Sequence, residues 1–111
     1  MIPQSALVRI YAEYDRATTK WPVFADRFLS PYTTDKDIRG EANVARHRSD
    51  AECDRHYWSV EATLREEVAE VMEAAMKLDW ANCKQELAQV ATVAIRAMEW
   101  IDKEILNGNK A

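Results

Sequence analysis

Two apolar stripes joined by a very short connection constrain the fold of this chain most strongly. Apolar residues recur every three or four positions across 60–78 and again across 80–107, which is the spacing of one face of an α-helix. The first stripe comprises Leu64, Val68, Val71, Ala75 and Leu78, and the second comprises Leu87, Val90, Ala91, Ala94, Met98, Ile101 and Ile105. With so short a connection, the two predicted helices must fold back on each other as an antiparallel hairpin.

The residues at the ends of these segments support the same boundaries. Ser59 is a favourable N-cap for the first helix, with Glu61 in its first turn. Asp79 can cap the second helix, and Gly108 is placed to stop it because glycine readily adopts the left-handed conformation that ends helices.

The rest of the chain also reads as helical. Its 111 residues include only 2 glycines and 3 prolines, a composition of long helices, and they predict a single all-α domain over 1–111. Apolar spacing predicts a helix over 5–19 and a short helical segment starting at Pro22. The charged stretch 37–57 is either an exposed helix or a mobile arm, so we take 1–55 as N-terminal helices or an arm and 56–107 as the hairpin core.

The size and the net charge of the chain limit the kinds of partner that we expect. A chain of 111 residues builds only a modest core, so we expect dimerisation into a four-helix-bundle-like fold, as a homodimer or a dimer of dimers. The net charge of −4 carries no basic footprint and argues against a nucleic-acid polymer as partner. The start of the chain lacks an apolar run of roughly 20 residues, so no membrane anchor is expected. Cys53 and Cys83 have no CxxC spacing, which favours reduced thiols and a cytoplasmic location.

Glutamates border the two stripes. A helical wheel of about 100° per residue places Glu67 and Glu70 at the edge of the first stripe, and Glu66 and Glu73 on the opposite, solvated side. On the second helix, Glu86 and Gln89 lie along the corresponding edge. Counting outward from Asp79, an antiparallel hairpin brings Glu70 level with Glu86, and Glu67 level with Gln89 about 4.5 Å further along.

Two interpretations of these side chains stay open from the geometry alone. Carboxylates converging beside an apolar interface repel one another unless a cation lies between them, and Mg²⁺ or Mn²⁺ prefers such oxygen ligands. The alternative is a solvated helix surface on which the glutamates pair with nearby basic residues.

The same residues resemble a known family, the all-α NTP pyrophosphatases of the MazG-like group. "EEVAE" at 66–70 is similar to the E-E-x-x-E motif of that family, and "ELAQ" at 86–89 is similar to its E-x-x-D motif except at the last position. The resemblance covers about residues 56–102, roughly half of the chain, and is closest to the short MazG-like proteins of phages and bacteria.

The resemblance implies a Mg²⁺ site and a reaction. By position, Glu67, Glu70, Glu86 and Gln89 would ligate Mg²⁺, with Mn²⁺ as a substitute, and the three glutamates would be catalytic. The implied activity is hydrolysis of a nucleoside triphosphate to the monophosphate and pyrophosphate, with purine deoxynucleotides as the assumed substrates.

Gln89 departs from the motif. Its amide oxygen can coordinate a metal but brings no charge, which weakens the expected site. The alternative function is therefore a catalytically degenerate MazG-like module that binds nucleotide or serves helical assembly.

Four further residues are candidates for substrate binding. Relatives often carry an aromatic residue near the nucleotide at the position of Trp58, so this side chain could stack on the base, although packing is the commoner fate of tryptophan. His56, Lys84 and Arg96 could contact phosphate, with surface solvation or ion pairing as the alternative.

Overall fold

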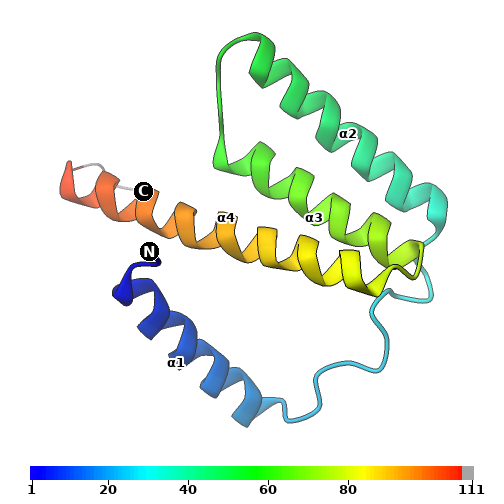
Figure 1. Ribbon diagram of the computed structural model, residues 1–111, viewed down its shortest axis with the longest axis horizontal. Coiled ribbons are helices and arrows are strands. Elements are labelled where there is room, and N and C mark those ends of the chain that lie inside the picture. The colour runs from blue at the N-terminus through cyan, green and yellow to red at the C-terminus, as the bar shows by residue number, and fades with distance from the viewer. Residues whose placement is uncertain (109–111) are drawn as a thin grey trace. The chain divides into compact units, whose positions relative to one another are not determined.

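Helices make up all the regular structure of residues 1–108, the part of the chain that the computed structural model describes. In chain order they are α1 (Gln4–Lys20), α2 (Asp35–Asp54), α3 (Val60–Met76) and α4 (Trp80–Leu106) (Figure 1). The predicted all-α class is confirmed. None of these helices combines the length and the apolar character that crossing a membrane requires.

The chain divides into two compact units. The first contains Met1–Arg27 and the residues from Ile95 onward, and the second contains Phe28–Ala94. Helix α4 runs through both, so its first half belongs to the second unit. All three motif glutamates lie in that second unit, together with α2 and α3.

The predicted helix ends are confirmed at three positions. The Ser59 side chain accepts a hydrogen bond from the Ala62 backbone N–H at 3.0 Å, and Asp79 Oδ1 accepts one from the Asn82 N–H at 3.2 Å. Gly108, two residues after the end of α4 at Leu106, has a φ of 82°, as its role as a stop requires.

Helix α3 ends at Met76, two residues earlier than predicted. Leu78 adopts a φ of 58°, and its N–H bonds to the Ala75 carbonyl at 3.0 Å. This left-handed residue turns the chain toward α4 and leaves the Leu78 side chain exposed, so the prediction that Leu78 belongs to the buried stripe was wrong.

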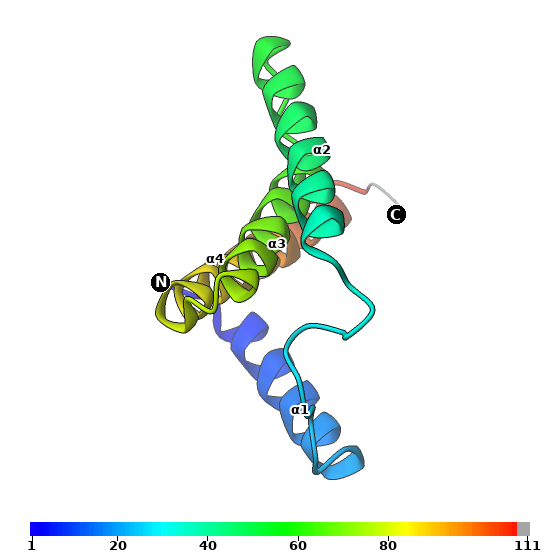
Figure 2. The ribbon, with the colours of Figure 1, turned by 90° about the vertical axis from the view of Figure 1, so that its right-hand side faces the viewer.

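Most of the charged segment 37–57 belongs to the well-capped helix α2, which ends at Asp54, and the mobile-arm alternative was wrong. Thr34 accepts a hydrogen bond from the Asp37 N–H, and the Asp37 carboxylate accepts one from the Thr34 N–H, both at 3.1 Å. This reciprocal capping box starts α2. Helix α2 contacts α3; the two run next to each other in the view of Figure 1 and cross at an angle in that of Figure 2.

Small residues form the buried face of α2. Ile38, Ala42 and Ala45 are buried at a spacing of four and three residues. Because alanine has little volume, the backbones of α2 and α3 can approach closely without large side chains between them. The exposed-helix alternative therefore holds for only part of the surface of α2.

An ion pair also connects these two helices. Arg46 of α2 binds the Glu73 carboxylate of α3 through both terminal nitrogens, with Nη1 at 3.3 Å from Oε2. The Glu73 side chain is only 20% exposed, so its predicted place on the solvated side was wrong. The hydrogen bond with Glu73 raises the pKa of Arg46.

The core of the second unit joins α3 to the start of α4. Its buried members are Val71, Ala74, Ala75 and Cys83, and Leu29, Met72 and Val90 pack against them. The Cys83 thiol donates a hydrogen bond to the Val71 carbonyl at 3.7 Å, which places the two helices in contact. The predicted hairpin therefore exists in this unit, although Leu87 of the second stripe is exposed and Cys83 is buried instead.

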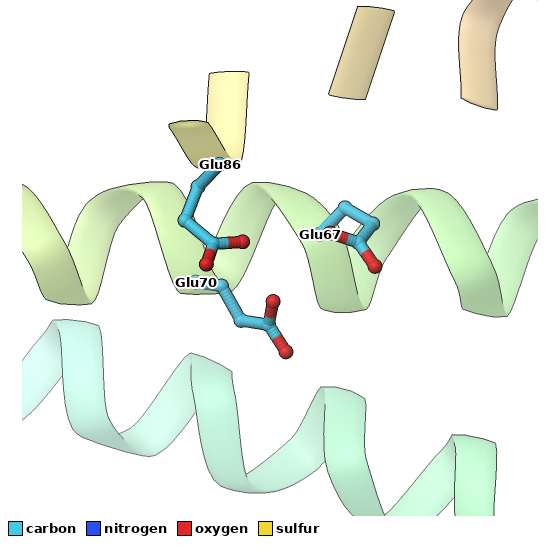
Figure 3. A group of neighbouring side chains, drawn as sticks. All are labelled: Glu67, Glu70 and Glu86. Atoms are coloured by element: carbon cyan, nitrogen blue, oxygen red, sulfur yellow. The ribbon is translucent and has the colours of Figure 1, made fainter. Parts of the chain in front are cut away.

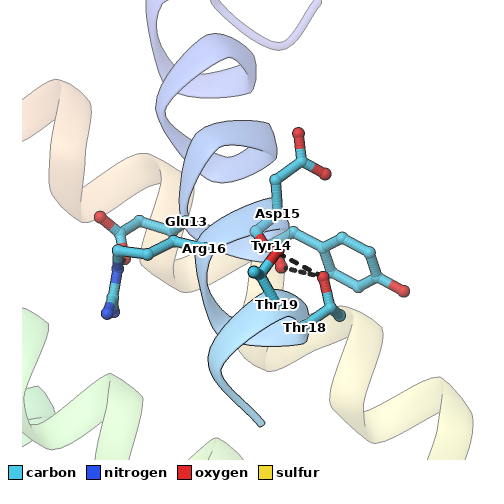
Figure 4. Close-up of polar contacts among 6 residues, drawn as sticks. All are labelled: Glu13, Tyr14, Asp15, Arg16, Thr18 and Thr19. Atoms are coloured by element: carbon cyan, nitrogen blue, oxygen red, sulfur yellow. Dashed lines mark hydrogen bonds and ion pairs between the residues drawn. The ribbon is translucent and has the colours of Figure 1, made fainter. Parts of the chain in front are cut away.

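The first unit contains α1, which begins one residue before and ends one residue after the prediction. Ala6 is its buried residue, whereas Ile10, Tyr11 and Tyr14 of its apolar stripe are exposed. Polar contacts cover its C-terminal half, including an Arg16–Glu13 ion pair at 2.9 Å and threonine hydroxyls that donate to carbonyls one turn back (Figure 4).

The prediction of a short helix starting at Pro22 was wrong. Residues 21–34 form an irregular connection between α1 and α2. Within the second unit, the Phe28 ring lies 5.7 Å from the Trp80 ring, centroid to centroid. This contact attaches the middle of the connection to the first residue of α4.

The ion pair between α2 and α3 can be tested by a double-mutant cycle. We expect Arg46→Ala and Glu73→Ala to show a coupling of about 0.5–1 kcal/mol in chemical denaturation, because Glu73 is largely shielded while Arg46 stays 44% exposed. The same cycle on Arg65 and Glu61, an exposed pair within α3, serves as the control and should give a smaller coupling. Equal couplings would show that Arg46–Glu73 adds nothing to the packing of α2.

A candidate metal centre at the α3–α4 hairpin

Three glutamates converge where α3 and α4 lie together. Glu67 and Glu70 extend from α3, and Glu86 extends from α4 toward Glu70 (Figure 3). One carboxylate oxygen from each of the three lies within 4.8 Å of the others. Within residues 1–108, they form a compact acidic cluster of the size that a single cation could bridge.

The core packing fixes which glutamates meet. Val71 follows Glu70 directly, and Cys83 precedes Glu86 by three residues. The Val71–Cys83 contact therefore sets the register of α3 against α4 at the point where the two carboxylates face each other. A one-residue slip in that register would rotate a helix by about 100° and separate them.

The cluster carries uncompensated charge. Glu67 Oε2 and Glu86 Oε2 are buried and have no hydrogen-bond partner among the described residues. Burial raises the pKa of Glu67, and the negative charges of Glu86 and Glu66 raise it further. Burial likewise raises the pKa of Glu70 to about 7, aided by its hydrogen bond with Glu86 and by the charges of Glu67, Glu86 and Glu66.

These side chains suit a hard divalent cation. Buried acceptors without donors are costly, and either a proton or a cation between the carboxylates would remove that cost. All the ligand atoms are carboxylate oxygens, which are preferred by Mg²⁺ and Mn²⁺ over softer metals. The donor set and the orphaned oxygens thus fit the metal that the motif implies.

A small pocket lies beside the cluster, between the C-terminal half of α2 and the start of α3. It measures about 240 Å³, and its wall includes Tyr57, Trp58, Ala62 and Glu66. Glu66 precedes Glu67 and lies one helical turn, about 6 Å of rise, from Glu70. The pocket and the carboxylates therefore form neighbouring parts of one surface in the second unit.

Comparisons with known proteins add no evidence to that of the two sequence motifs. No family model matches the chain, and neither the curated proteins nor the solved structures include a significant match. The resemblance to the MazG-like group therefore rests on the sequence alone, above all on the "EEVAE" and "ELAQ" segments.

The other predicted site residues occupy varied positions. Trp58 lines the pocket and is 75% exposed, so its ring is accessible for stacking. Gln89 is exposed on α4, one turn after Glu86. His56 is exposed in the turn before α3 with a φ of 61°, a conformation that histidine tolerates better than most residues.

The two predicted phosphate-binding cations receive no support from the geometry. Lys84 is exposed and lies two residues from Glu86, and helical side chains at that spacing do not share a face. Arg96 is exposed and belongs to the first unit. A role for either residue stays a prediction.

Two features of this surface were missing from the sequence prediction. Arg46 reaches α3 next to the cluster, where the charges of Glu70 and Glu66 add to the effect of Glu73 in raising its pKa. Glu52 accepts hydrogen bonds from the Ser59 N–H and hydroxyl, which secures the turn below the pocket. One sequence signal could have shown that α2 packs against this surface. It is the regular spacing of Ile38, Ala42, Ala45 and Ser49, a stripe of mostly small residues along α2.

The raised pKa of Glu70 predicts a distinctive pH dependence of stability. Its value of about 7 in the folded chain exceeds the usual 4.5, so its contribution to stability is complete below pH 4.5 and is lost as pH rises through 7. In EDTA, Glu70→Gln should gain on the order of 1–2 kcal/mol relative to wild type between pH 4.5 and 8, measured by urea unfolding.

Glu61→Gln, an exposed substitution on the same helix, is the matched control and should show no pH-dependent gain. Mg²⁺ at pH 8 should stabilise wild type but not Glu70→Gln. A difference between Glu70→Gln and wild type that does not change with pH would contradict the proximity of these carboxylates.

Proposed function

We propose that this protein is a Mg²⁺-dependent nucleoside triphosphate pyrophosphohydrolase. The observation that carries the proposal is the convergence of Glu67, Glu70 and Glu86 within 4.8 Å, with buried oxygens that lack partners. The resemblance of "EEVAE" and "ELAQ" to the MazG-like motifs supplies the reaction. The products would be a nucleoside monophosphate and pyrophosphate.

Glu67, Glu70 and Glu86 are the residues that would hold the ion. When bound, Mg²⁺ supplies charge neutralisation of the phosphates and activation of a water molecule for attack. The carboxylates would hold the ion from two helices, and the core contact between Val71 and Cys83 keeps those helices in register. Glu70 must release any proton it carries before it can act as a ligand, which weakens metal binding below pH 7.

The pocket beside Trp58 is the proposed position of the base. Its volume of about 240 Å³ is below the roughly 300–1,000 Å³ of complete small-molecule sites, so it suits one part of a ligand. Tyr57 and Trp58 provide aromatic surface for stacking, and Glu66 links the pocket wall to the carboxylate cluster. Purine deoxynucleotides remain the assumed substrate class.

A second function has one observation in its favour. Gln89, at the place of the last motif acid, is neutral and exposed, so the ion would lack a fourth carboxylate. A degenerate module that binds nucleotide without hydrolysing it would keep the same fold and the same pocket.

Turnover separates the two functions. With Mg²⁺ and a panel of NTPs and dNTPs, wild type should release pyrophosphate, and Glu70→Gln should lower kcat/KM by about 100-fold or more, because a metal ligand is lost. Glu61→Gln should retain wild-type activity. If no substrate is turned over above the Glu70→Gln background, the hydrolase is rejected. A rise in Tm with Mg²⁺ and a nonhydrolysable nucleotide would then support the binding module.

Position 89 gives an independent prediction. If Gln89 is a weak ligand, Gln89→Asp restores a carboxylate and should lower the Kd for Mg²⁺ by about 10-fold in calorimetric titration. Gln85→Asp adds the same charge one turn away from Gln89 on α4, and should have a smaller effect. Equal effects of the two substitutions would mean that Gln89 acts only through overall charge.

A further inference from the structure

An accessible arginine lies beside the carboxylate cluster. Arg46 of α2 binds the Glu73 carboxylate of α3 through both terminal nitrogens. The Arg46 side chain is nevertheless 44% exposed, whereas that of Glu73 is only 20% exposed. A ligand from solution can therefore reach this guanidinium, and no step of the proposed function yet uses it.

Three features follow one another along one edge of α3. Glu66 lines the pocket beside Trp58, Glu70 belongs to the carboxylate cluster, and Glu73 holds Arg46. These three glutamates are spaced by four and then three residues, so they lie on one side of the helix, about 6 Å and 4.5 Å apart in rise. The cluster is therefore between the pocket and the arginine.

Helix α2 presents Arg46 to this same edge. Arg46 lies four residues before Asp50, which lines the pocket, and residues at this spacing share one side of a helix. The hydrogen bond with Glu73 is the main cause that raises the pKa of Arg46, and the charge of Glu73 adds to it. The charges of Glu70 and Glu66 raise this pKa further. The guanidinium is thus close to the cluster as well as to its own partner.

The pocket itself is unsuited to phosphate. Its lining contains Asp50, Glu52 and Glu66 and, among residues 1–108, no basic side chain. Carboxylates repel phosphate, because bringing like charges together is costly. A nucleotide would therefore place its base in the pocket and direct its phosphates toward the cluster and Arg46.

A nucleoside triphosphate has the same linear order as this edge: a base, then the α-phosphate, then two terminal phosphates. We propose that Arg46 binds the terminal phosphates of the nucleotide, exchanging its ion pair with Glu73 for phosphate oxygens. This inference rests on the proposed function, from which it takes the ligand. The planar guanidinium presents parallel N–H donors that suit phosphate as well as carboxylate. Before the nucleotide binds, Glu73 holds those donors in place.

Equilibrium binding to the full chain tests the proposal without turnover. With Mg²⁺ and the α,β-imido analogues of the common NTPs and dNTPs, Arg46→Gln should raise the Kd by about 10-fold or more, because charge-assisted hydrogen bonds are lost. The Kd for the matching monophosphate should not change, because that ligand lacks the terminal phosphates. The matched control is Arg48→Gln, two residues along α2 and about 200° around it, which should change neither Kd.

Glu73→Gln distinguishes an exchange of partners from a purely structural ion pair. This substitution frees the guanidinium and should lower the Kd for the triphosphate analogue by about 3-fold, whereas a loss of helix packing would raise it. When Arg46→Gln is already present, Glu73→Gln should give no such gain, and a double-mutant cycle measures the difference. Circular dichroism checks that all variants keep their helices.

The failure of this inference can be distinguished from that of the proposed function. Equal Kd changes for Arg46→Gln and Arg48→Gln, or an equal loss of affinity for the monophosphate, overturn the role of Arg46 and leave the hydrolase standing. A gain from Glu73→Gln that persists without Arg46, or a loss in its place, does the same. If wild type shows the predicted Kd effects but no turnover, the role of Arg46 is supported and the hydrolase is rejected. A wild type that binds no analogue overturns both.

Discussion

Repulsion among three carboxylates in one partly buried space is the constraint on which the rest of this structure depends. Glu67, Glu70 and Glu86 gain nothing from one another as anions, since burial and mutual charge raise the pKa of both Glu67 and Glu70. They stay together because the contact of Val71 with Cys83 holds α3 against α4. The apolar core therefore supports an arrangement that the charges alone would separate, which is typical of sites that bind a ligand.

Close packing of mostly small residues determines where α2 lies against α3. Ile38, Ala42 and Ala45 let α2 approach α3, and the Arg46–Glu73 ion pair fixes their relation at a point next to the cluster. This arrangement brings a guanidinium near several glutamates without placing it between them. It also forms much of the pocket beside Trp58 and much of a long groove along α2 and α3, whose lining is completed by Phe28, Leu29, Ser30 and Thr33.

The parts of the fold that could be predicted are those governed by local chemistry. Helix periodicity, the caps at Ser59 and Asp79 and the stop at Gly108 depend on neighbouring residues, and wheel geometry brought Glu70 and Glu86 to one level. The burial of α2 could not be predicted from large apolar residues, because its contact face is mainly alanine. Leu87 of the predicted stripe is exposed and Cys83, outside that stripe, is buried, because the α3–α4 turn, with Leu78 left-handed, sets the rotation of α4. Such a turn depends on tertiary contacts.

The two faces of α3 explain how a weakly buried unit can support a strained acidic cluster. One face carries Glu67 and Glu70, and another face carries Leu64, Val68 and Met72 along the groove. Burial on the groove face adds apolar stabilisation, at roughly 25 cal/mol per Å², without covering or neutralising a carboxylate. Burial on the other face would raise the cost of every charge there. Burial along the groove therefore adds to the stability that the α3–α4 core supplies without raising the cost of the carboxylates, so covering the groove and charging the cluster are compatible requirements on one helix.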